Sequence, residues 1–206
     1  MLTLFTAPGT CALATHIALA EASADYALRR VKFAENEQRS PEYLTINPLG
    51  RVPALVTPDG ALTETPALLV FVAQTHPTAR LAPLSDPVAF AKLQSFNSYL
   101  ASTVHVAHAH RPRASRWADD AAAIEAMRAK VPETMTAAFT LIENALEGPW
   151  VLGEQYSVSD GYLFTLTRWL ASDSVDVEIF PKVKAHHDRM AERPAVKRAL
   201  AEEAAL

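Results

Sequence analysis

The sequence predicts two units of different class, an α/β unit followed by an all-α unit. Short apolar runs typical of strands occur in the first third of the chain, whereas helical spacing of apolar residues dominates the rest. Between the two patterns lies Thr78–Ser85, a stretch that contains a proline and has no periodicity. We therefore expect an α/β domain over residues 1–77, a linker over 78–85 and a helical domain over 86–206.

The first unit has the pattern strand, helix, strand, helix, then two strands and a helix. Leu2–Thr6 is predicted to be a short buried strand, and the apolar residues after its Pro8-Gly9 turn recur at helical spacing. Tyr26–Phe33 alternates as a second strand, and Pro41–Ile46 indicates a short helix. The expected order is βαβαββα.

The stretch from Asn47 to Pro66 makes unusual backbone demands. Its first residues, Asn-Pro-Leu-Gly, predict a turn that leads to Val52-Pro53, where a proline opens an apolar strand. We expect this bond to be cis, with the backbone groups of Val52 turned outward as a partner for a peptide backbone. A Pro-Asp-Gly turn at 58–60 then joins two short strands.

The end of the same stretch predicts a helix start suited to a small ligand. Thr65 is the expected N-cap and Pro66 the first helical residue, with the helix continuing to about Thr75. The Glu64 carboxylate, the Thr65 hydroxyl and free N–H groups then meet at the positive end of a helix. This combination favours a zwitterionic, peptide-like ligand.

Cys11 is the single cysteine of the chain. If Thr10 caps the helix, Cys11 lies in its first turn, where free N–H groups and the helix dipole favour a thiolate. A lone cysteine can equally be a small buried hydrophobe. Because no Cys-x-x-Cys partner is present, its position favours a thiol that holds or exchanges with a thiol ligand over a dithiol oxidoreductase.

The second unit is predicted to consist of helices that begin at a capping residue or a proline. A long helix should run from Asp86 to about His110, and Pro132 should kink or split the next one. The residues Ser-Val-Ser-Asp at 157–160 form a capping-box pattern before a strongly apolar helix. The predicted helix starts are Asp86-Pro87, Asp119, Ser157, Pro181 and Pro194.

Three histidines cluster near the end of the first long helix. His105 and His108 can share a face, but no second cysteine and no carboxylate at ligand spacing completes a metal site, so we expect no metal. His108 and His110 also fit a solvated helix end, where a cation is favoured by the dipole.

Composition excludes some classes of partner. The formal charge is -4 and no run of Lys or Arg is present, which argues against nucleic acid. No apolar run is long enough to span a membrane, and one cysteine cannot form an internal disulfide. Since no charged-then-apolar leader precedes Leu2, we expect a cytoplasmic protein.

Several motifs resemble a known family. Asn-Pro-x-Gly-x-Val-Pro at 47–53, followed by Leu-Thr-Glu at 62–64, resembles the glutathione-binding half of the glutathione S-transferases. Pro-Gly-Thr-Cys at 8–11 and Ser-x-Val-His at 102–105 are most similar to their bacterial beta class. The likeness covers essentially the whole chain. It implies a thioredoxin-like first domain, glutathione as cosubstrate, no metal, a homodimer and a role in detoxification.

The resemblance also implies roles for particular residues. Glu64 and Thr65 would hold the amino group and carboxylate of the glutamyl moiety, and the Val52 backbone would pair with the cysteinyl moiety. Cys11 and His105 would be catalytic, and His108 and Trp169 would line the electrophile site, although Trp169 fits a core position equally well. The implied glutathione-binding residues are Thr10, Cys11, Val52, Pro53, Glu64, Thr65 and His105.

Two departures from the family pattern bear on the mechanism. Thr6 stands where several classes use a tyrosine to activate the thiol. The family's lysine after the second strand has no counterpart in Glu35-Asn36-Glu37, where two acidic residues would repel the glycyl carboxylate. Arg39 and Arg51 are the candidates to substitute for this lysine.

The predicted function is transfer of glutathione to a small hydrophobic electrophile, or glutathione-dependent thiol exchange through Cys11. A non-catalytic protein that binds glutathione or a hydrophobic ligand is the alternative of another class, since a fold does not imply a function. A glutathione-dependent isomerase or dehalogenase is a further alternative that only substrate trials separate.

Overall fold

The computed structural model describes all 206 residues. Four strands form one mixed sheet in the order β2-β1-β3-β4. Strand β1 is parallel to β2 and antiparallel to β3, and β3 forms a hairpin with β4. The bounds of this unit are β1 (Leu2–Thr6), α1 (Ala12–Glu21), β2 (Tyr26–Arg30), α2 (Pro41–Ile46), β3 (Ala54–Thr57), β4 (Gly60–Thr63) and α3 (Thr65–Thr75). The predicted βαβαββα order is confirmed, and the unit is thioredoxin-like.

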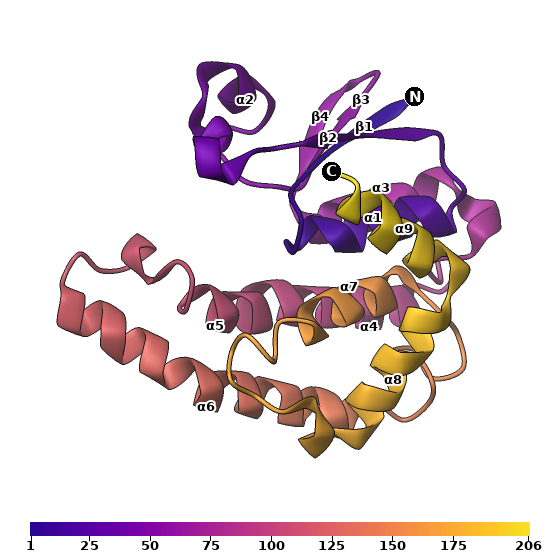
Figure 1. Cartoon of the computed structure of the whole chain (residues 1–206). Coiled ribbons are helices and arrows are strands. Elements are labelled where there is room, and N and C mark those ends of the chain that lie inside the picture. The colour runs from indigo at the N-terminus through magenta and orange to yellow at the C-terminus, as the bar shows by residue number, and fades with distance from the viewer.

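Alternation along β1 divides its side chains between the two faces of the sheet. Leu4 is fully buried in the main core with α1 and α3, whereas Phe5 packs against Tyr43 of α2, with ring centroids 5.7 Å apart. Helix α1 also contacts α7 and α9, so it lies between the sheet and the helical unit (Figure 1). The start of α1 is therefore enclosed from both sides.

The rest of the chain is helical, as predicted. A stretch of π-helix over Leu100–Val104 joins α4 to α5, and α6 passes through Pro132 without splitting. Helix α9 returns to α1, where Glu202 lies 2.8 Å from both His16 Nε2 and the Tyr26 hydroxyl. The helices are α4 (Pro87–Tyr99), α5 (His105–Ala109), α6 (Ala121–Ala145), α7 (Val158–Thr167), α8 (Pro181–Glu192) and α9 (Pro194–Ala204).

Several predicted boundaries are wrong by a few residues. The second strand ends at Arg30, because residues 33–35 form a 3-10 turn, and Asp120 rather than Asp119 caps α6. Cys11 occupies the N-cap position of α1 in place of Thr10, and Glu64 occupies that of α3 in place of Thr65. No helix in the structure is both long enough and apolar enough to cross a membrane.

Candidate functional site

The turn before β3 is held in place by side chains that the sequence supplies locally. Asn47 Nδ2 and the Tyr43 hydroxyl both donate to the Arg51 carbonyl, at 2.7 and 2.6 Å. Gly50 has φ +61, and a Cβ there would lie 2.7 Å from the Gln38 carbonyl oxygen, so only glycine fits. These contacts fix the backbone that enters Val52.

Val52 presents an unpaired backbone N–H. The Val52-Pro53 bond is cis, which confirms the sequence prediction. The Val52 N–H has no acceptor within the chain, and the Val52 carbonyl accepts only the Cys11 thiol, at a Sγ–O distance of 3.5 Å. An extended peptide backbone can therefore pair with Val52.

Cys11 lies at the centre of this region but is not the thiolate that the sequence predicted. Its side chain is 7% exposed and belongs to the main core. Burial raises the pKa of the Cys11 thiol to about 11, although the nearby Thr65 hydroxyl and the Cys11 N–H act in the opposite direction. The loss of hydration caused by tertiary packing raises the pKa more than the N–H groups at the helix start lower it. The thiol is therefore protonated at neutral pH. The Cys11 N–H has no carbonyl acceptor.

Glu64 and Thr65 form the corner between β4 and α3. Glu64 is exposed and adopts φ +72, an unfavourable conformation for a residue with a side chain. Thr65 is 5% exposed and begins α3, so its N–H has no acceptor in the preceding turn of that helix. A carboxylate and a free N–H thus stand side by side at the positive end of a helix.

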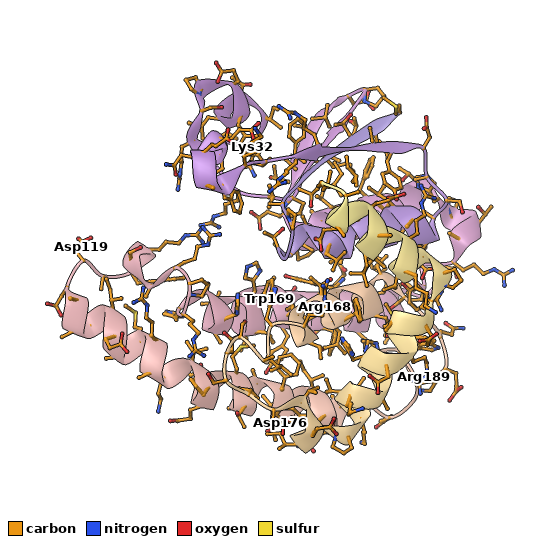
Figure 2. The ribbon with its side chains drawn as sticks, viewed as in Figure 1. Lys32, Asp119, Arg168, Trp169, Asp176 and Arg189 are labelled. Atoms are coloured by element: carbon orange, nitrogen blue, oxygen red, sulfur yellow. The ribbon has the colours of Figure 1, made fainter.

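The helical unit contributes aromatic rings to the opposite wall. Trp169 lies between the two units, and its Nε1 donates to the Gly9 carbonyl at 3.0 Å (Figure 2). The ring centroids of His105 and His108 lie 5.1 and 4.1 Å from that of Trp169. Burial, followed by His108 and three arginines, lowers the pKa of His105 to about 4, so this imidazole is neutral at pH 7.

His108 is not the solvated helix-end residue that the sequence allowed. Its Nδ1 lies 2.7 Å from Oδ2 of Asp173, a carboxylate that is fully buried. The sequence carries no signal for this pair, because the two residues are 65 positions apart. His110 instead stacks on Trp117, with centroids 4.2 Å apart.

One cavity of about 670 Å³ brings these residues together. Thr6 does not line it, whereas Tyr162, which the sequence analysis missed, does. Tyr162 is 1% exposed and its hydroxyl has no hydrogen-bond partner in the chain. Every predicted site residue lines the cavity, namely Thr10, Cys11, Val52, Pro53, Glu64, Thr65, His105, His108 and Trp169.

Comparison with known proteins agrees with this geometry. Residues 1–74 match the glutathione S-transferase N-terminal domain, and residues 109–203 match the C-terminal domain. Glutathione S-transferase GstA of Escherichia coli O157:H7 is 30% identical over 97% of this chain and 98% of its own length. The chain belongs to the glutathione S-transferase family.

Solved structures of this family include close structural matches. A glutathione transferase homolog from Sulfitobacter, solved with bound glutathione, is 48% identical, with a TM-score of 0.95 and coverage of 100% of this chain and 99% of its own. The beta class glutathione S-transferase of Sphingomonas chungbukensis is 32% identical, with a TM-score of 0.87 and coverage of 99% and 100%. The predicted resemblance to the family and its beta class is confirmed.

In this glutathione S-transferase four arginines line the cavity, whereas Glu35-Asn36-Glu37, which stand in place of the family's lysine, do not. Arg39, Arg51, Arg113 and Arg116 all line the cavity, and Glu64 is the only carboxylate among the lining residues. No group of three or more His, Cys, Asp or Glu side chains is arranged to hold a metal ion.

Proposed function

We propose that the cavity binds glutathione and that the protein transfers it to a small electrophile with an apolar body. The observation that carries this proposal is the unpaired Val52 N–H beside the buried Cys11 thiol, in the cavity that Glu64 and Thr65 also line. The family supports the same cosubstrate. It also supports a homodimer in the cytoplasm with a role in detoxification, which we include in the proposal.

Each of the three moieties of glutathione has a complementary group among the residues that line the cavity. Its glutamyl ammonium would bind the Glu64 carboxylate, and its glutamyl carboxylate would accept from Thr65. Its cysteinyl backbone would pair with Val52. The glycyl carboxylate would then face Arg39 and Arg51, which replace the lysine of the family.

The sulfur of glutathione would lie among neutral donors. The Cys11 N–H, the protonated Cys11 thiol and the unpartnered Tyr162 hydroxyl can each donate to a thiolate, and the neutral His105 imidazole can accept or return a proton. The glutathione thiolate attacks the electrophilic atom, a carbon–sulfur bond forms, and the bond to the leaving group breaks with its electron pair. The thiol proton passes to solvent.

The state of Cys11 favours conjugation over thiol exchange. Exchange through Cys11 needs its thiolate, and a pKa of about 11 leaves very little thiolate at pH 7. A protonated thiol is instead a hydrogen-bond donor. Cys11 therefore positions and stabilises the glutathione sulfur and does not attack it.

We expect Cys11→Ser to keep most transferase activity and Cys11→Ala to lose part of it. Serine retains a donor at this position, whereas alanine removes one hydrogen bond, worth roughly 1 kcal/mol or about fivefold in kcat/KM. The measurement is the conjugation of glutathione to 1-chloro-2,4-dinitrobenzene, together with the intact mass of the protein after incubation with oxidised glutathione.

The non-catalytic and the thiol-exchange alternatives predict different results in these two measurements. Glutathione binding without turnover of any electrophile would support the non-catalytic binding protein. A glutathione adduct that forms rapidly on the wild type, with Cys11→Ser as inactive as Cys11→Ala, would support thiol exchange.

A further inference from the structure

We propose that the electrophile half of the cavity takes an anionic electrophile, one that carries a carboxylate or a comparable oxyanion held by Arg113 and Arg116. This inference rests on the proposed function and narrows its substrate class. It differs from the purely hydrophobic electrophile that the sequence alone predicted.

The four arginines of the cavity have no ion-pair or hydrogen-bond partner, which among the other arginines is true only of Arg80, an exposed residue outside the cavity. No carboxylate lies within 4 Å of their guanidinium groups, and none of these groups donates a hydrogen bond within the chain. Eight of the other arginines donate to a protein acceptor or pair with a carboxylate, namely Arg29, Arg30, Arg111, Arg128, Arg168, Arg189, Arg193 and Arg198. Unpaired guanidinium groups gathered in one cavity indicate an anionic ligand.

Glutathione alone does not balance this charge. With its two carboxylates and one ammonium it brings one net negative charge, or two when the sulfur is ionised. The cavity offers four guanidinium groups against the single carboxylate of Glu64, although the whole chain carries a formal charge of -4. Positive charge therefore remains after glutathione binds, and a second anion would be attracted to it.

The place of Arg113 and Arg116 assigns them to the electrophile and not to glutathione. Both follow α5, the helix that carries His105 and His108, and they reach the cavity from the helical unit. Arg39 and Arg51, by contrast, flank the glutathione-binding turn. Burial is the main cause that lowers the pKa of Arg116, and repulsion from Arg113, Arg51 and Arg39 lowers this pKa further; an anion would relieve that repulsion.

The surroundings of these two arginines favour a planar body for the anion. The Arg113 guanidinium lies 5.3 Å from the centroid of the Phe33 ring. Trp117, which is 47% exposed, and Trp169 also line the cavity. Aromatic faces beside guanidinium groups suit an aromatic carboxylate.

The test compares two electrophiles with the same leaving group, 4-chloro-3,5-dinitrobenzoate and 4-chloro-3,5-dinitrobenzamide. Each rate is normalised to the uncatalysed reaction with glutathione. In both, sulfur bonds to the ring carbon and chloride leaves with the electron pair. We expect the wild type to prefer the carboxylate in kcat/KM by about tenfold or more, the range for one charge-assisted contact.

The double variant Arg113→Met/Arg116→Met should lose this preference and keep its kcat/KM for the benzamide within about twofold. Arg111→Met is the matched control, because Arg111 lies on the same loop, donates to Ser174 and does not line the cavity. It should keep the preference. A KM for glutathione that rises about tenfold in the double variant, measured with the benzamide, would assign these arginines to glutathione and overturn the inference.

Binding of the two glutathione conjugates by calorimetry separates the inference from the proposed function. Turnover of both electrophiles without preference would overturn the inference alone. No turnover, but tighter binding of the carboxylate conjugate that Arg113→Met/Arg116→Met abolishes, would overturn the proposed transferase and support the anion site. Equal binding of both conjugates without turnover would overturn both.

Discussion

Replacing Asp160 with alanine is expected to lower the free energy of unfolding by about 3–5 kcal/mol. Its carboxylate is fully buried and accepts from the Ser157 N–H at 2.7 Å, the Ser157 hydroxyl at 3.0 Å and the Val151 N–H at 2.8 Å. His186 Nε2 lies 3.0 Å away on the other side. Removing the carboxylate leaves these buried polar groups without a partner. Urea denaturation followed by circular dichroism measures the loss.

Asp120→Ala is the matched control for this prediction. Asp120 also caps a helix, accepting from the Ala123 N–H at 2.8 Å, but it is exposed. Its loss should lower the free energy of unfolding by about 1 kcal/mol. If Asp160→Ala were no more destabilising than Asp120→Ala, the buried network would not be the anchor of α7.

Glu64→Gln should weaken glutathione binding by about 10- to 100-fold. The substitution keeps the shape of the side chain but removes the charge that faces the glutamyl ammonium, and a hydrogen bond to a charged group contributes roughly 1.5–3 kcal/mol. Calorimetric titration of the protein with glutathione at pH 7 gives the dissociation constant directly.

Two further variants calibrate the effect of Glu64→Gln. Thr65→Ala removes one neutral hydroxyl and should cost about 1 kcal/mol of binding free energy. Glu35→Gln removes an exposed charge outside the cavity and should leave affinity unchanged. An unchanged dissociation constant in Glu64→Gln would show that the glutamyl end of glutathione binds elsewhere.

Features fixed by local chemistry were predictable from the sequence. The order of the strands and helices, the cis bond before Pro53 and the capping box at 157–160 all depend on residues close together in the chain. The motif residues named from the sequence all line one cavity, because short local motifs place Thr10 and Cys11 before α1 and Glu64 and Thr65 at the start of α3.

Features fixed by tertiary packing were not predictable. A helix start predicts a low thiol pKa at Cys11, but burial of the sulfur in the core raises this pKa, although the Thr65 hydroxyl acts in the opposite direction. Asp173 reaches His108 only because the chain that follows α7 returns to α5. The arginines at 113 and 116 belong to a loop whose position no periodicity reveals.

The ultraviolet absorbance of thiolate at pH 7 tests the central claim most directly. The protein alone should show no thiolate, because the pKa of Cys11 is about 11, and addition of glutathione should produce one thiolate for each chain. S-methylglutathione should produce none, and Cys11→Ala should still show the band with glutathione, at lower intensity. A thiolate band in the protein before glutathione is added, or no band after it is added, would contradict the assignment of the nucleophile to glutathione.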